Sequence, residues 1–246
     1  PITDATGAVI EVNAGPGLRM HLAPSEGMPR NVGAAIVNML YPEGALARIP
    51  IVAVTGTNGK TTTTRLIAHL ATQAGYSTGY TTTDGIYIQN QPVYTGDCSG
   101  PQSAEMVLKD SSVNFAVFEC ARGGILRAGL GFDRCNVSVI TNITEDHLEL
   151  DDIMTLEQMA RVKSVVARST FDDGYAILNA DDDLVYGLKD ELTCKIALFS
   201  CQGSNERILA HRRAGGWAAV VDNGYFKLIK GEYLFSLVVL YDVFLL

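Results

Sequence analysis

The sequence predicts an α/β fold in which helices flank a mostly parallel sheet, and three observations support this prediction. From Ile51 onward, short apolar segments alternate with stretches of helical periodicity, as in chains that build parallel sheets. A glycine-rich loop joins the first apolar segment to a helical pattern. The chain has 246 residues, of which 47% are hydrophobic, so it is long enough to bury one sizeable core.

The predicted strands of this sheet are short and rich in apolar residues. They are Ile51–Thr55, Phe115–Glu119, Val137–Thr141, Tyr175–Asn179 and Lys195–Phe199. A helix is expected after the first strand, with Gly75 as its C-terminal cap, because apolar residues recur there at helical spacing. These residues are Leu66, Ile67, Leu70, Ala71 and Ala74.

The first 49 residues differ in character from the rest. We expect a short strand at Val9–Val12 and a helix at Asn31–Leu40, followed by a linker at Pro42–Pro50. This pattern predicts a small first unit over residues 1–49 and a larger domain over residues 50–246.

Composition excludes several classes of partner. The formal net charge of -8 argues against nucleic acid, which needs an excess of Lys and Arg. Five cysteines without a CxxC pair predict neither a disulfide framework nor a zinc site, and they fit a reducing cytoplasm. The apolar run Tyr233–Leu246 contains Asp242 and is shorter than the ~20 residues that cross a bilayer. We therefore expect no membrane contact, and interpret this run as core, interface or a damaged end.

The glycine-rich loop has the residues of a nucleotide-phosphate site. Its members are Gly56, Thr57, Asn58, Gly59, Lys60, Thr61 and Thr62. Glycines let backbone N–H groups surround phosphate oxygens, and the following helix N-terminus adds partial positive charge. Lys60 adds a full charge, and the Thr61 hydroxyl is suited to ligating Mg²⁺. Val54 stands where the usual P-loop has a glycine, so this is a shorter variant. An ordinary glycine-rich turn is the alternative.

Polar residues that follow other predicted strands are candidates for the same site, because open parallel sheets bind ligands at the carboxyl ends of their strands. Glu119 ends an apolar strand and offers oxygen to a hard cation, although a solvated carboxylate would look the same. His147 lies in a loop after another strand, where a lone histidine is more often a surface residue. Asn179 and Asp182 are either ligand contacts or a helix-capping turn.

Lys163 occupies an unusual position for a cation. In the predicted helix that follows Thr155, it shares a stripe with Leu156, Met159 and Val166. Burial favours the neutral amine, and a neutral amine can react with CO₂ to form a carbamate. The alternative is a lysine whose charged end reaches solvent from a core face.

Five features together resemble the Mur ligases and folylpolyglutamate synthases. They are the loop Gly56–Thr62, Glu119 at a strand end, Thr141–His147, Lys163 and Asn179–Asp182. The resemblance implies a Mur-type P-loop central domain and an ATP-dependent ligase that activates a carboxylate for attack by an amine. It also implies that the loop and Asn179 and Asp182 bind ATP, that Thr61, Glu119 and His147 bind Mg²⁺, and that Lys163 is carbamylated. Lys60, Lys163 and His147 would then be the catalytic residues.

Finer features resemble one branch of that superfamily, the cyanophycin synthetases. They are Thr81–Tyr87, Gly96–Pro101, Glu119–Arg127 and Glu11–Leu18, the last of which resembles the final strand of an ATP-grasp domain, with Glu11 and Asn13 as Mg²⁺ ligands. This resemblance implies that aspartate and arginine are polymerised on an acidic, peptide-like primer by a cytoplasmic homo-oligomer. This chain would join arginine to aspartate side chains. Candidate substrate contacts are Thr82, Thr83, Asp84, Ser99 and Arg122, of which Arg122 is suited to a bidentate contact with an aspartate carboxylate.

The extent of the resemblance predicts how the chain is organised. It runs from about Val9 to about Gly231, which implies the end of an ATP-grasp domain and a linker over residues 1–49. Residues 50–246 would be the central domain without its C-terminal lid, so we expect a partial chain. A peptidoglycan Mur ligase or a folylpolyglutamate synthase is an alternative, against which Glu11–Leu18 argues. An ATP-binding fragment without ligase activity is another.

Overall fold

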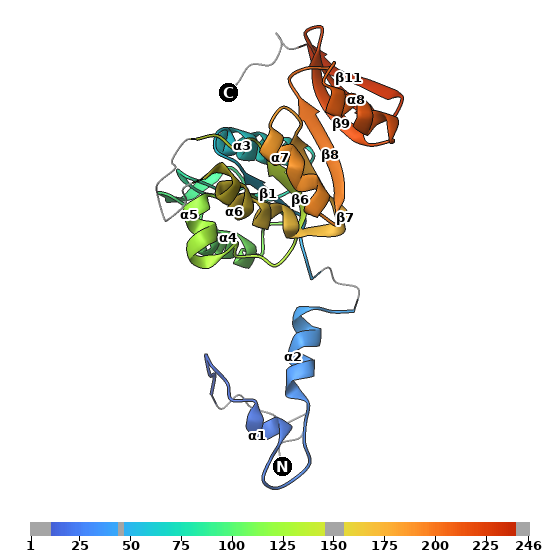
Figure 1. Ribbon diagram of the computed structural model, residues 1–246. Helices are drawn as coiled ribbons and strands as arrows, with labels where there is room; N and C mark the ends of the chain where they lie inside the picture. Colours follow the sequence, from blue (N-terminus) through green and yellow to red (C-terminus); the bar gives the residue numbers. More distant parts are fainter. Residues whose placement is uncertain (1–10, 44–46, 146–154, 240–246) are drawn as a thin grey trace. The chain divides into compact units, whose positions relative to one another are not determined.

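The computed structural model describes residues 11–43, 47–145 and 155–239. The chain divides into two compact units, Pro1–Arg48 and Ile49–Leu246 (Figure 1). Within the described residues, no helix is both long enough and apolar enough to cross a membrane.

The first unit contains two helices, α1 (Arg19–Leu22) and α2 (Val32–Leu40). The predicted helix at Asn31–Leu40 is confirmed: the side chain of Asn31 accepts a hydrogen bond from the backbone N–H of Ala34 at 3.0 Å and caps α2. The predicted strand at Val9–Val12 is not found in its described half, since Glu11 and Val12 have irregular backbone, and its first two residues lie outside the described part.

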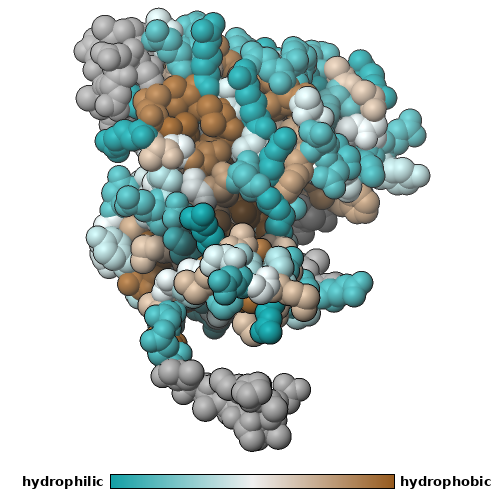
Figure 2. Space-filling model, turned by 90° about the horizontal axis from the view of Figure 1, so that it is seen from below, coloured by the Kyte–Doolittle hydropathy of each residue, from teal (hydrophilic) through white to brown (hydrophobic). Residues whose placement is uncertain are grey.

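Apolar side chains of this first unit are exposed. None of its described residues is buried, and the exposed large ones are Val12, Met20, Leu22, Met28, Ile36, Val37, Met39, Leu40 and Tyr41. On the face drawn in Figure 2, apolar side chains (brown) are exposed among hydrophilic ones (teal). The described residues of this unit thus form no apolar core of their own.

The two predicted Mg²⁺ ligands of this unit lie together, because Asn13 Nδ2 donates to Glu11 Oε1 at 3.0 Å.

The second unit is built on one 11-stranded sheet with the order β11-β10-β9-β8-β7-β6-β1-β5-β2-β3-β4. Its parallel part runs from β9 to β2, and an antiparallel pair follows at each end. The parallel strands are β9 (Trp217–Asp222), β8 (Lys195–Ser200), β7 (Thr170–Asn179), β6 (Cys135–Ile140), β1 (Ile51–Thr55), β5 (Phe115–Glu119) and β2 (Thr78–Thr82). The end pairs are β10 (Tyr225–Lys230) with β11 (Tyr233–Val239), and β3 (Gly85–Ile88) with β4 (Gln91–Thr95).

This sheet confirms the predicted fold class. The five predicted strands correspond to β1, β5, β6, β7 and β8, although β6 ends one residue earlier and β7 begins earlier than predicted. The apolar run that begins at Tyr233 enters the structure as the edge strand β11. Its described side chains are not core: Tyr233, Leu234 and Phe235 are 74%, 52% and 49% exposed.

Helices cover both faces of the parallel sheet (Figure 1). They are α3 (Lys60–Gln73), α4 (Pro101–Lys109), α5 (Arg122–Ala128), α6 (Leu156–Arg168), α7 (Asp183–Gly187) and α8 (Glu206–Arg213), with a 3₁₀ turn at Leu188–Glu191. Side chains of β1 alternate between the faces, as in any strand. Val52 and Val54 share a core with Ala68 of α3, whereas Ile51 and Ala53 share a core with residues of α4 and α6.

The predicted helix after β1 is confirmed as α3, and its buried face consists of small side chains. Leu66 and Leu70 are 52% and 58% exposed, and the buried residues of the helix are Thr64, Ala68 and Ala71. Small side chains on this face let α3 lie close to β1, β2 and β5. Gly75 follows the helix with φ +91°, as its predicted capping role requires.

Candidate nucleotide and metal site

The glycine-rich loop connects β1 to α3 in backbone conformations that suit glycine. Gly56 has φ +145°, and a Cβ there would lie 1.9 Å from Thr141 Oγ1. Gly59 has φ +81° at the N-cap of α3, where a Cβ would meet nothing within 4 Å. The loop therefore turns sharply into the helix, and the helix N-terminus presents its N–H groups at the carboxyl edge of the sheet.

A second loop, residues 141–144 after β6, holds the P-loop in place. Thr57 N donates to Asn142 O at 2.8 Å, and Asn58 N donates to Asn142 Oδ1 at 2.9 Å. Thr141 Oγ1 donates to Asn58 O at 2.6 Å, and Thr144 N donates to Thr57 Oγ1 at 3.1 Å. The sequence motif included these residues, but their role as supports follows only from the fold, which brings residues more than 80 positions apart together.

Asn179 and Asp182 support the same second loop. Asn179 Nδ2 donates to Thr141 O at 2.8 Å. Asp182 accepts from Ile143 N at 2.6 Å through Oδ2 and from Val185 N at 3.0 Å through Oδ1, which also caps α7. The capping interpretation of Asp182 is thus confirmed, and contact with a nucleoside stays a prediction for both residues.

Glu119 has the geometry of a ligand for a cation. Its side chain is 2% exposed, and Oε2 accepts hydrogen bonds from Thr61 Oγ1 at 2.8 Å and Thr83 N at 3.2 Å. Oε1 is buried and has no hydrogen-bond partner in the described part of the chain. A buried, unpaired carboxylate oxygen is costly unless a cation or a donor completes it. Glu119 and Thr61 therefore fit Mg²⁺, which binds oxygen ligands.

A metal ion at Glu119 and Thr61 would need further ligands besides these two residues. Among the residues that the structure describes, no group of three or more His, Cys, Asp and Glu side chains is arranged for a metal. Mg²⁺ characteristically keeps water and phosphate oxygens and takes only one or two carboxylates from a protein. His147, the other predicted metal ligand, lies outside the described residues.

Lys163 is buried, as its place on the apolar stripe of α6 predicts. Its side chain is 3% exposed, and Nζ donates to Gly56 O at 2.8 Å. Burial lowers the pKa of Lys163 to about 7, with further lowering from the charges of Lys60 and Arg122. The helix begins at a capping box in which Thr155 and Gln158 exchange side-chain and backbone hydrogen bonds, and this fixes the register that buries Lys163.

A cavity of about 190 Å³ lies beside the P-loop and collects three basic side chains. Lys60, Arg122 and Lys163 line it, together with Gly56, Thr57, Ala121, Gly123 and Met159. Lys60 Nζ donates to Thr57 O at 2.8 Å, which holds the ammonium group at the loop. Positive charges that share a cavity repel one another, and a bound anion offsets this repulsion. The cavity therefore suits phosphate or carboxylate groups.

The predicted substrate contacts do not lie in one place. Arg122 lines the cavity beside the P-loop. Thr83 lies at the candidate metal site, with Oγ1 3.3 Å from Thr61 Oγ1. Thr82 is buried and donates to Asp84, whose other carboxylate oxygen is ion-paired with Arg65.

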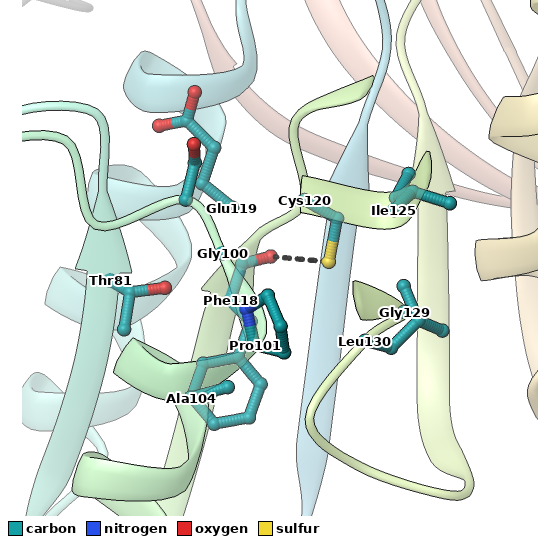
Figure 3. A pocket seen from close by; sticks show the side chains of 11 residues that line it. Thr81, Gly100, Pro101, Ala104, Phe118, Glu119, Cys120, Ile125, Gly129 and Leu130 are labelled. Carbon is teal, nitrogen blue, oxygen red and sulfur yellow. Dashed lines mark hydrogen bonds between the residues drawn. The ribbon is translucent and has the colours of Figure 1, made fainter. Parts of the chain in front are cut away.

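Ser99 lies in a second, much smaller cavity of about 10 Å³ that reaches Glu119. Ser99 Oγ donates to Asp97 Oδ1 at 2.6 Å. Figure 3 shows the Glu119 carboxylate pointing away from Phe118 and Ala104, which line the apolar end of this cavity. Cys120 Sγ also lines the cavity and is 3.8 Å from Phe118 O. This space is too small for a substrate, and contact between Ser99 and a substrate stays a prediction.

Comparisons with known proteins point to one family. The family model described as Mur ligase middle domain matches residues 54–224. A solved structure of UDP-N-acetylmuramoyl-L-alanyl-D-glutamate–2,6-diaminopimelate ligase is similar with a TM-score of 0.60 and 25% identity, over 82% of this chain and 41% of that one.

Curated relatives are more similar in sequence. Cyanophycin synthetase from Geminocystis herdmanii is 55% identical over 233 residues, which is 95% of this chain and 27% of the relative. Cyanophycin synthetase from a Synechocystis species is 54% identical over the same shares of both chains. The chain thus spans about a quarter of the length of these relatives.

Proposed function

Because the chain belongs to the Mur ligase middle domain family, we propose that it carries the ATP site of an amide-forming ligase of the cyanophycin synthetase type. One observation carries this proposal: Lys60, Arg122 and Lys163 converge on a cavity beside a P-loop whose Thr61 contacts Glu119, a buried carboxylate with one oxygen that has no partner among the described residues. ATP supplies the phosphoryl group that converts a carboxylate into an acyl phosphate, which an amine then attacks.

Lys60 and Arg122 have separate tasks in that reaction. Lys60 and the N–H groups at the start of α3 bind phosphate oxygens, with Thr57, Asn58 and Thr62 beside them in the loop. Arg122, at the start of α5 on the cavity wall, orients the carboxylate that is to be activated. Alignment of the two reactants in one cavity, together with stabilisation of phosphate charge, accelerates such a reaction. Asn179 and Asp182 complete the nucleotide site through the loop that they support.

Metal binding is assigned to residues at the strand ends. Thr61 and Glu119 would hold Mg²⁺, and the buried Oε1 of Glu119 supports this assignment. Mg²⁺ supplies neutralisation of phosphate charge when bound. His147 is proposed for a second metal ion by resemblance alone.

Lys163 is proposed to carry a carbamate. The neutral amine attacks the carbon of CO₂ and forms a C–N bond, while the electron pair of one C–O π bond moves to oxygen. The nitrogen then loses a proton to water, which leaves a carbamate anion. Burial that lowers the pKa of Lys163 to about 7 supports this step, because it maintains the neutral nucleophile near neutral pH. The product would present two oxygens to the cavity beside Lys60 and Arg122, in place of a third positive charge.

Aspartate, arginine and an acidic peptide-like primer are the proposed substrates, with arginine joined to aspartate side chains in this part of the enzyme. Identity of 55% to a cyanophycin synthetase, against 30% to a UDP-N-acetylmuramoylalanine–D-glutamate ligase from Caldanaerobacter subterraneus, favours this choice over a peptidoglycan ligase. We further propose that residues 1–49 end an ATP-grasp domain, that residues 50–246 are the central domain, and that the complete enzyme is a cytoplasmic homo-oligomer.

The complete protein encoded by the gene is the right material for the test. It is incubated with ATP, Mg²⁺, aspartate, arginine and an aspartate–arginine primer, while primer extension and phosphate release are measured. Release that needs both amino acids and is lost in Lys60→Ala, but not in the exposed control Lys109→Ala, is the expected result. Phosphate release with a different carboxylate and amine, and none with these, would refute the substrates and retain the Mur-type chemistry.

A further inference from the structure

Arg65 lies on α3, one helical turn after the metal-site residue Thr61. Its guanidinium group is ion-paired with Asp84, and Nη2 also donates to the Tyr87 hydroxyl at 3.2 Å. The Tyr87 ring is itself fixed by stacking on Tyr80, with 4.7 Å between ring centroids. The guanidinium is therefore held in one orientation by contacts from β2, β3 and the turn between them.

Asp84 is the second residue of the two-residue turn that connects β2 to β3. One carboxylate oxygen is paired with Arg65, and the other accepts a hydrogen bond from the buried hydroxyl of Thr82. The backbone carbonyl of Asp84 accepts from Gly96 N at 3.1 Å, which ties the turn to the end of β4. These contacts restrain the turn, and one of them comes from an arginine that belongs to the nucleotide-binding helix.

Thr83 carries this constraint to the metal site. It lies directly before Asp84, and its backbone N–H donates to Glu119 Oε2 at 3.2 Å. Its hydroxyl lies 3.3 Å from Thr61 Oγ1, which also contacts Glu119 Oε2. Both contacts hold the same carboxylate oxygen, so Oε1 is the one left without a partner in the described part of the chain.

We propose that Arg65 is a positioning residue for Mg²⁺: its ion pair with Asp84 fixes the turn whose Thr83 N–H orients Glu119, so that Oε1 faces the cation. This inference rests on the proposed function. Arg65 reaches the metal only through Asp84, Thr83 and Glu119, and it is not a catalytic residue. Asp84 then has a structural partner, which assigns it a role other than the substrate contact expected from the sequence.

A purely structural ion pair would behave differently. Arg65 and Asp84 have side chains that are 46% and 49% exposed, and ion pairs at this exposure add little to folding stability. Ligand geometry is more demanding, because a displacement of a fraction of an ångström in a supporting contact is enough to weaken a site. Loss of Arg65 should therefore weaken Mg²⁺-dependent nucleotide binding much more than it weakens the fold.

The test measures ATP affinity of the complete protein by calorimetric titration, once with Mg²⁺ and once with EDTA. The ratio of the two affinities isolates the contribution of the metal. For Arg65→Met we expect this ratio to fall about 10-fold, the typical effect of losing a residue that supports a metal ligand, with the affinity in EDTA unchanged. Arg65→Lys should recover part of the loss. The matched control is Arg168→Met. Arg168 is the last residue of α6 and forms a similarly exposed ion pair with Glu191, so its loss should leave the ratio unchanged.

Two outcomes overturn the proposal, and they are distinguishable. If the wild-type protein binds ATP more tightly with Mg²⁺ and Arg65→Met keeps the same ratio, Arg65 has no part in the metal site and the proposed function stands. If the wild-type protein does not bind ATP, the proposed function fails together with the inference. In a double-mutant cycle, Asp84→Asn should add no further loss to Arg65→Met, because both variants break the same link.

Discussion

The Nζ atom of Lys163 donates a hydrogen bond to the carbonyl oxygen of Gly56 at 2.8 Å and so joins α6 to the P-loop across 107 residues of chain. The bond brings a buried amine to the cavity that Lys60 and Arg122 also line. Burial and these two charges lower the pKa of Lys163 to about 7, against an ordinary value of 10.5. A protonated lysine there is costly, so the fold favours a neutral amine near neutral pH.

The first prediction concerns the pH dependence of stability. Between pH 7 and 10.5 the unfolded chain holds a proton on Lys163 that the folded protein releases, so the free energy of unfolding falls as the pH falls through this window. Each unit of pKa shift corresponds to about 1.4 kcal/mol. We expect Lys163→Met to reduce the difference in unfolding free energy between pH 9.5 and pH 7 by about 3 kcal/mol. Urea denaturation in CO₂-free buffer measures it, and identical pH profiles for both proteins would contradict the lowered pKa.

The second prediction separates the two glycines of the P-loop. Ala at Gly56 would place a Cβ 1.9 Å from Thr141 Oγ1 in addition to an unfavourable φ, whereas Ala at Gly59 meets only the unfavourable φ of +81°. Gly59→Ala should cost about 1 kcal/mol, and Gly56→Ala about 3 kcal/mol or more. Thermal unfolding of the two variants provides the comparison. Equal losses would mean that Thr141 does not press on Gly56.

The third prediction concerns Glu119. Its buried carboxylate has one oxygen, Oε1, without a partner in the described part of the chain. Because an uncompensated buried charge destabilises the fold, Glu119→Gln should raise the unfolding free energy by about 1 kcal/mol in the absence of metal. The same change removes an anionic ligand, so Mg²⁺ should cease to strengthen ATP binding. Calorimetric titration and thermal unfolding of one protein sample measure both effects. A variant that is less stable, or that keeps its response to Mg²⁺, would argue against a metal at Glu119.

The fourth prediction concerns Asn142, which supports the P-loop through the Asn58 backbone N–H. Asn142→Ala should lower ATP affinity about 10-fold, because the loop loses a contact that fixes its shape. Asn136→Ala is the matched control: Asn136 Oδ1 accepts from Ile51 N at 2.9 Å, at the opposite end of β1. The control should lose stability and keep its ATP affinity. If both variants bind ATP equally well, the second loop is not a support for the nucleotide.

Five of the seven parallel strands were predictable from short apolar runs that alternate with helical patterns, whereas β9 was missed. The strand β2 was not predicted: Thr78–Thr82 is rich in threonine, yet all five residues are buried. Its hydroxyl groups form hydrogen bonds within the fold, such as Thr78 Oγ1 with Thr72 Oγ1 at 2.9 Å. The antiparallel pairs at the two ends of the sheet were also missed, and at one end β4 is exposed throughout and lacks the apolar run that marks a buried strand.

Two residues of the site show what local pattern can and cannot predict. The burial of Lys163 was predictable, because helical periodicity alone puts it among apolar residues. The ion pair between Arg65 and Asp84 was not, because it depends on how β2 and β3 pass beside α3. The spacing of Leu66 and Leu70 predicted the helix but not its contact face, which the small residues Ala68 and Ala71 occupy.

The nucleotide site at the P-loop is best tested by calorimetric titration of the complete protein with ATP and Mg²⁺, beside Lys60→Ala and the exposed control Lys109→Ala. We expect the wild type and the control to bind ATP equally. Lys60→Ala should lose about 100-fold in affinity, since a charged contact to phosphate in a partly buried site is worth about 3 kcal/mol. Equal ATP affinity in Lys60→Ala and the wild type would contradict a nucleotide site at this loop.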